Sequence, residues 1–84
     1  MSDEKVQHLV EQAVFQQFEQ WAKQHPSLAS VIDGIALGDQ AVQSLRNTEG
    51  YRQAVAGYHQ ARNEQELFGQ LLTLAEVALS AILK

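Results

Sequence analysis

The C-terminal segment, residues 67–83, is apolar over more of its circumference than a helix on the surface of a core needs. On a helical wheel its apolar residues cover an arc of roughly 200°, whereas little more than about 100° is enough for a surface helix. These residues are Leu67, Phe68, Leu71, Leu72, Leu74, Ala75, Ala78, Leu79, Ala81, Ile82 and Leu83. Such a helix must be covered from at least two sides. We expect either the central helix of the chain, or a helix whose second flank packs against another subunit.

Apolar residues spaced three and four apart run through the rest of the chain and predict helices only. Residues 3–24 form the first amphipathic helix, which ends at His25 because a residue before proline is pushed out of the α region. Its apolar stripe consists of Val6, Val10, Val14, Phe18 and Trp21, widened by Leu9, Ala13, Phe15 and Ala22. No run of alternating polar and apolar residues favours a strand.

Ser27 is expected to cap a second helix. The apolar side of this helix consists of Leu28, Val31, Ile32, Ile35, Val42 and Leu45. Gly34 and Gly38 lie inside it, where each costs about 1 kcal/mol relative to alanine. Two interpretations remain open. In one, Ser30, Gly34 and Gly38 form a flat strip that another helix can approach closely. In the other, the helix breaks near Gly38.

The clearest linker spans residues 46–48, and Asn47 or Thr48 can cap a third helix after it. Asn63, followed by Glu66 three residues later, resembles a capping box and predicts a fourth helix from Glu64. The apolar phase also continues across Asn63, so a single helix over residues 49–83 is the alternative to the break that we favour. The fold class is therefore all-α, a small antiparallel helical bundle of three to five helices.

Residues 51–79 resemble a helix pair of the tetratricopeptide-repeat family. The second helix of such a repeat has a tyrosine, an alanine, an aromatic residue and an alanine at the spacing of Tyr51, Ala54, Tyr58 and Ala61. The chain departs from the family pattern where Gly38 and Val42 replace a large and a small residue, and where Glu66 replaces the closing proline. It also has no self-similarity at the family's period of about 34 residues. The resemblance implies a helix hairpin that binds a peptide or a protein.

Composition limits both the size of the protein and its chemistry. With 84 residues the chain is expected to form one domain, residues 1–84, and without cysteine it has neither disulfides nor thiolate metal sites. The net charge of −4 argues against nucleic-acid binding, and Arg46, Arg52 and Arg62 are too few and too dispersed for a DNA-reading helix. The charged N-terminus, and the lack of about 18 consecutive apolar residues, predict a cytoplasmic protein that does not enter a membrane.

Groups that could carry out chemistry are sparse. Glu4, His8 and Glu11 share one face of the first helix and are the one arrangement that suggests a metal site. Their order is the reverse of the Glu-x-x-His pairs of di-metal bundles, so we interpret them as a solvated helix face. No serine lies in a nucleophile motif and no glycine-rich phosphate loop occurs. No catalytic residue, metal or cofactor is therefore predicted.

Phe15, Phe18 and Trp21 lie close together on the first helix. We expect them to be core, because a small domain needs its largest side chains buried. A ligand pocket or an interface anchor is the alternative, since aromatic clusters are common in binding hot spots. Tyr51 and Tyr58 are expected to bury their rings and to keep their hydroxyl groups at the edge.

These patterns predict a small non-enzymatic protein–protein interaction module, either an adaptor or a regulatory subunit. We expect it to associate through helix faces, as a homodimer or with a larger partner. The alternative is a small helical protein that binds a metal or another ligand. The residues predicted for the interface come from the glycine strip and the apolar C-terminal segment: Gly34, Gly38, Leu72, Leu79, Ile82 and Leu83.

Overall fold

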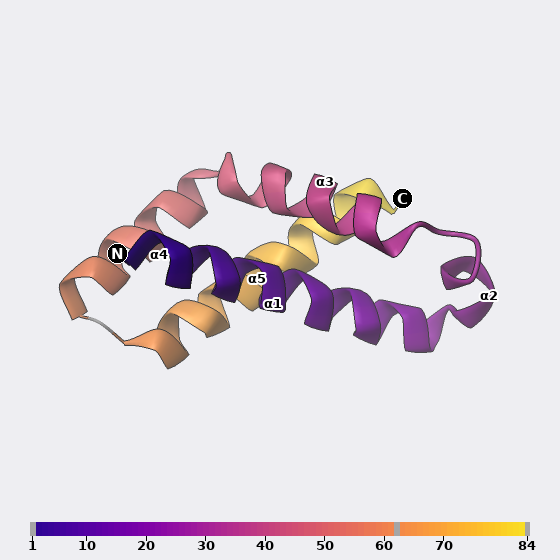
Figure 1. Cartoon of the computed structure of the whole chain (residues 1–84), viewed down its shortest axis with the longest axis horizontal. Helices are drawn as coiled ribbons and strands as arrows, with labels where there is room; N and C mark the ends of the chain where they lie inside the picture. The colour runs from indigo at the N-terminus through magenta and orange to yellow at the C-terminus, as the bar shows by residue number, and fades with distance from the viewer. Residues whose placement is uncertain (1, 62, 84) are drawn as a thin grey trace.

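The computed structural model describes residues 2–61 and 63–83, and this part of the chain folds into five helices without a strand. They are α1 (Ser2–Gln24), α2 (Pro26–Ala29), α3 (Gly34–Arg46), α4 (Glu49–Ala61) and α5 (Glu64–Ile82). The helices form an elongated bundle of 42 × 20 × 19 Å (Figure 1). The predicted all-α bundle is confirmed, as is the break between the third and fourth predicted helices. Arg62 lies outside the described residues.

The helices α1 and α3 run side by side in opposite directions, and so do α4 and α5 (Figure 1). At the connection of residues 47–48 the chain does not reverse its direction. After a bend, α4 continues in the general direction of α3. Both α3 and α4 pack on α5. The long α5 is covered by two shorter helices in succession, and for this reason a short connection here does not give an antiparallel pair.

The helix α5 is the central helix of the chain, which was one of the two placements expected for this segment. It packs against α1, α3 and α4. Its buried residues are Leu67, Leu71, Ala75, Ala78 and Leu79. Val77 is the apolar residue that interrupts the polar side of the helix, and it is 64% exposed. Although the apolar arc of α5 is wide, no helix in the described residues is both long and apolar enough to cross a membrane.

The second predicted helix is divided, and the interpretation that it breaks near Gly38 places the division wrongly. Pro26–Ala29 forms a single turn, residues 30–33 are not helical, and α3 begins at Gly34 rather than breaking near Gly38. The predicted Ser27 cap is also wrong, because Pro26 takes the first helical position and His25 the N-cap position.

Asp33 explains why the chain restarts a helix at this point. Its backbone is extended, with φ −76° and ψ 101°, and its carboxylate accepts the backbone N–H groups of Ile35 and Ala36 at 3.1 and 3.3 Å. Two of the donors that a helix N-terminus leaves without partners are thereby satisfied. A local carboxylate cap thus outweighs the apolar periodicity that continues through the segment.

The two later helix starts follow the sequence prediction. Thr48 accepts the backbone N–H of Tyr51 through its hydroxyl oxygen, and Asn63 accepts that of Glu66 through its amide oxygen, both at 3.1 Å. The core lies between α5 and the inner faces of α1, α3 and α4. Its buried members outside α5 are Val6, Val10, Ala13, Val14, Leu37, Ala41, Leu45, Ala54 and Tyr58.

Candidate interaction surface

Four large apolar side chains stay exposed where α1, α2 and α3 meet. Phe15 is 50% exposed, Leu28 56%, Val31 80% and Ile35 73%. We call these four residues the apolar face. Val77 on α5 is the other strongly exposed large apolar residue of the described chain, and it does not belong to this group. Single exposed apolar residues are normal, but several together at one end of a small protein indicate a surface for binding.

The glycines of α3 determine where Phe15 lies. Its ring lies against Gly38, 3.7 Å from the position where a Cβ atom would be, and the ring of Phe18 lies 3.4 Å from that position at Gly34. Ile35, Gly38 and Val42 follow one another at helical spacings of three and four, so Ile35 and Val42 flank the site where Phe15 rests. The glycine strip is therefore covered by aromatic rings of the same chain.

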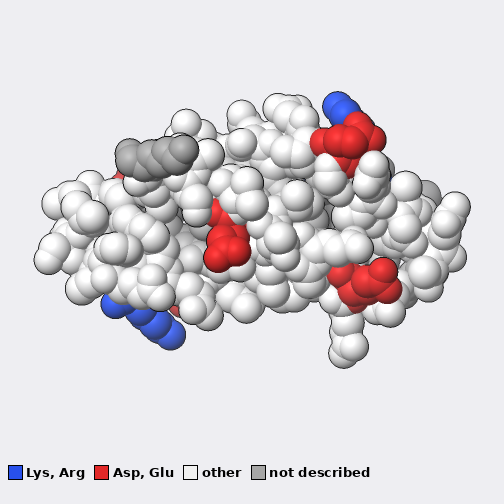
Figure 2. Space-filling model, turned by 180° about the vertical axis from the view of Figure 1, so that it is seen from behind, with Lys and Arg blue, Asp and Glu red and all other residues white. Residues whose placement is uncertain are grey.

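Leu28 and Val31 extend the apolar face over the connection between α2 and α3. The backbone N–H of Val31 donates to the carbonyl of Leu28 at 3.2 Å, which places both residues in one turn. Residues 24–45 contain no lysine or arginine. Figure 2 shows this end of the molecule at the left, where the tip consists of uncharged residues and a basic side chain projects from the lower edge.

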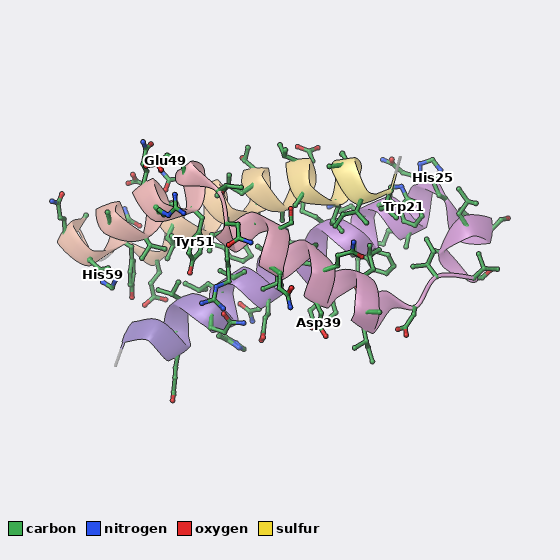
Figure 3. All side chains as sticks on the ribbon, turned by 90° about the horizontal axis from the view of Figure 1, so that it is seen from above. Trp21, His25, Asp39, Glu49, Tyr51 and His59 are labelled. Atoms are coloured by element: carbon green, nitrogen blue, oxygen red, sulfur yellow. The ribbon has the colours of Figure 1, made fainter. Side chains whose placement is uncertain are left out.

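The three aromatic residues of α1 are divided between the surface and the core. The expectation that all three are core is wrong for Phe15, because α3 meets this side of α1 with glycines, which leave half of the Phe15 ring uncovered. It is also wrong for Trp21, because only Phe18 of the three is among the residues that pack against the core. Phe18 and Trp21 are half-buried and stack with ring centroids 5.9 Å apart. Trp21 also lies 5.1 Å from the ring of His25 at the end of α1 (Figure 3).

The six residues predicted for the interface are spread over different environments. Gly38 is buried and Gly34 is half-buried against the rings of α1, and Leu79 is only 3% exposed. Leu72, Ile82 and Leu83 are half-buried around α5. Gly38 contacts the apolar face through the ring of Phe15, whereas the four predicted leucine and isoleucine residues lie on or just after α5. Gly38 and Leu79 offer little surface to a partner.

Glu4, His8 and Glu11 are exposed and line one open pocket of about 550 Å³. The other walls come from α3 and α4 and include Arg46, Tyr51 and Val55. Arg46 donates to the side-chain oxygen of Gln7 at 2.8 Å, and the Gln7 amide donates to the Glu11 carboxylate at 3.0 Å. Among the described residues no group of three histidine or acidic side chains is placed to hold a metal ion.

A second groove, of about 400 Å³, lies between α1 and the C-terminal half of α5. Its lining combines Trp21 and two of the predicted interface residues, Leu79 and Leu83, with the polar side chains of Gln17, Gln20, Gln24, Glu76 and Ser80. Gln17 also donates to the backbone carbonyl of Leu72 at 2.9 Å and so ties α1 to α5.

Sequence reasoning missed Leu28, Val31 and Ile35 as surface residues, because it placed them on the buried side of one continuous helix. The signal that could have found them is Asp33, an N-cap residue in the middle of that segment. A helix start at Gly34 separates Leu28 and Val31 from the periodicity of α3.

No protein-family model, curated protein or solved structure matches the chain. The resemblance of residues 51–79 to a tetratricopeptide-repeat helix pair therefore stays a prediction. Function has to be argued from the surface itself.

Proposed function

We propose that this protein is a small non-enzymatic interaction module, an adaptor or a regulatory subunit, that binds another protein through the apolar face. The observation that carries the proposal is the exposure of Phe15, Leu28, Val31 and Ile35 in a chain whose core is closed around α5. Aromatic and large aliphatic side chains of this kind supply most of the binding energy at the centre of protein interfaces.

The total surface supports the same proposal. The chain exposes 5614 Å², whereas a monomeric protein of 9.3 kDa is expected to expose about 5,000 Å². The excess of about 600 Å² is close to the roughly 800 Å² that one partner buries in an interface of standard size. The elongated shape of the bundle is one source of the excess, and the uncovered side of the α1–α3 pair is another.

A capture experiment with matched variants tests the proposal. The wild-type chain, Ile35→Gln and Val77→Gln are each immobilised and exposed to an extract of the native organism, and the bound proteins are identified by mass spectrometry. Ile35→Gln changes the apolar face, whereas Val77→Gln changes an equally exposed residue of α5. We expect a set of proteins that the wild type and Val77→Gln retain and Ile35→Gln loses. The same set on all three chains would show that the apolar face is not the binding surface.

Light scattering of the purified chain addresses the homodimer separately. If the partner is a second copy, the measured mass doubles with rising concentration for the wild type and stays that of one chain for Ile35→Gln. A wild-type chain that stays monomeric and also retains no protein in the capture experiment would contradict the proposed function itself.

A further inference from the structure

Resting on the proposed function, we infer that the partner presents a basic amphipathic helix, which lies along the outer surface of the α1–α3 pair. Its apolar side covers the apolar face, and its lysine or arginine side chains meet the carboxylates that surround this face. The inference depends on the charge pattern around Phe15 and Ile35.

Four exposed carboxylates surround the apolar face. On α1, Glu11 and Glu19 lie one helical turn before and after Phe15, at a spacing of four residues. On the α3 side of the pair, Asp33 caps α3 beside Ile35. Asp39 lies one turn after Ile35, on the outer side of α3 (Figure 3).

Lys23 and Arg46 are the basic side chains near these carboxylates, and they compensate only part of the negative charge. The two ion pairs of the described residues join Lys5 of α1 to Glu64 of α5 and Arg52 to Glu49 within α4, and they involve none of the four carboxylates. Lys23 lies one turn beyond Glu19, at the end of α1. Arg46, in the last turn of α3, lines the same pocket as Glu11 and donates to Gln7, which in turn donates to Glu11. A partner with lysine or arginine beside its apolar residues complements this pattern.

Beyond the apolar face, an open pocket bounded by α1, α3 and α4 adjoins this surface at Glu11 and also contains Arg46. The open pocket of about 550 Å³ is lined by Glu4, His8 and Glu11, and Glu11 is also the residue one turn before Phe15. Glu4, Glu11 and Glu19 follow one another on α1 at intervals of seven and eight residues, which is about two helical turns or 11 Å. Basic residues two turns apart on a second helix aligned with α1 match this interval.

The same charges decide against two other occupants. A second copy of the chain would bring the four carboxylates of one face against the four of the other, and like charges at close range oppose association. Nucleic acid is disfavoured for the same reason. A helix is preferred to an extended strand because the described residues contain no sheet edge to which a strand could be added.

Fluorescence anisotropy with two synthetic peptides tests the inference. Both are about 16 residues long, enough to run from Glu4 to Glu19, and both carry leucines on one helical face. One has lysines beside the leucines and the other has glutamates. We expect the lysine peptide to bind about tenfold or more tightly than the glutamate peptide, and its affinity to fall as the salt rises from about 50 to 300 mM.

Three variants locate the binding surface. We expect E11Q/E19Q to weaken the lysine peptide by about tenfold and to reduce its salt dependence, and Ile35→Gln to weaken both peptides. Glu76→Gln, which removes one exposed charge from α5, is expected to change neither affinity. Circular dichroism shows whether each variant keeps the helical fold.

Three results would overturn the inference. They are equal affinity for the two peptides, an unchanged affinity of E11Q/E19Q, and a dimer in light scattering that Ile35→Gln abolishes. None of these results contradicts the proposed function. The capture experiment tests that function separately, because it shows whether any protein binds through Ile35. If none of the three chains retains a protein in the capture experiment, the proposed function is contradicted, whatever the peptides show.

Discussion

Asn63 shows how a single side chain defines the start of the central helix. Its backbone is extended, with φ −96° and ψ 99°, and its amide oxygen accepts the backbone N–H of Glu66. Without this acceptor, a donor in the first turn of α5 would depend on water. The side chain therefore favours the separation of α4 from α5 over one long helix.

Replacing Asn63 by alanine is expected to lower the free energy of unfolding by about 1 kcal/mol, since the cap is lost and the exposed site leaves no cavity. Urea unfolding followed by circular dichroism measures the change. Gln60→Ala, at an exposed position inside α4, is the control and is expected to stay within about 0.5 kcal/mol of the wild type. A loss of similar size in both variants would mean that the cap contributes nothing specific.

Glycines inside the later helices allow a stabilising change to be predicted. A Cβ atom at Gly57 or Gly69 meets nothing within 4 Å, so Gly57→Ala and Gly69→Ala are each expected to raise stability by about 0.5–1 kcal/mol. At Gly50 the same atom lies 2.9 Å from Cδ2 of Leu74, which must move. Thermal unfolding should rank Gly50→Ala below the other two. Equal gains at all three positions would show that Leu74 moves aside at no cost.

For single residues, the sequence predicts those features that depend only on neighbouring residues in the chain. Thr48 and Asn63 were identifiable as caps because their partners lie three residues ahead. Asp33 has the same kind of partners, two and three residues ahead, but the apolar periodicity on both sides of it favoured a continuous helix. Two local signals conflicted there, and in the structure the Asp33 cap outweighs the continuing periodicity.

At the scale of elements, α5 supplies most of the burial in the core. Leu71 is 0% exposed at the middle of this helix. Leu71→Ala is expected to lower the free energy of unfolding by about 2–5 kcal/mol, because it removes apolar contacts and leaves a cavity. Val77→Ala on the same helix, at a site that is 64% exposed, should change it by less than about 0.5 kcal/mol. Equal losses in urea unfolding would contradict the central placement of α5.

An ion pair joins the first turns of α1 and α5. The Lys5 ammonium lies 2.6 Å from the Glu64 carboxylate, and the hydrogen bond and the charge of Glu64 raise the pKa of Lys5 above its ordinary value. A raised pKa in the folded state means that the pair stabilises the fold fully below the ordinary lysine pKa of about 10.4. This contribution is lost as the pH rises through the folded value.

Glu64→Gln is expected to return the pKa of Lys5 toward its ordinary value. Added salt is expected to lower the pKa of Lys5 in the wild type by a smaller amount, because it screens the charge of Glu64. Nuclear magnetic resonance of the lysine side chain over the alkaline range measures both. Because the side chains are about half exposed, the effect on stability is expected to be small. A pKa that does not move in Glu64→Gln would show that the pair does not form in solution.

The apolar arc of α5 was readable from sequence, and so was its need for cover on two sides. Which element supplies the cover was not, and the placement of Phe15 shows why. Phe15 lies on the wide apolar side of α1, but only part of that side can face α5. The rest of this apolar side packs against α3, which has glycines at the contact. Exposure at one residue thus depends on a partner helix about 20 residues away in the chain, which no local pattern specifies.

For the whole molecule, one core shared by α1, α3, α4 and α5 predicts one unfolding transition. Trp21 reports on the end near α2, and circular dichroism reports on all helices. We expect the two urea curves to coincide, with the same midpoint. A fluorescence transition at a lower urea concentration would mean that the end of the molecule with the apolar face unfolds before the rest. The apolar face would then be a locally unstable region.

The place of α5 in the chain has a consequence for synthesis. This helix covers α1, α3 and α4, yet all three leave the ribosome before it does. Translation of its 19 residues takes roughly one to four seconds at about 5–20 residues per second. During that interval the faces of α1, α3 and α4 that pack on α5 are uncovered. The nascent protein is then at its most dependent on chaperones, and a delay in translation within α5 would lengthen that exposure.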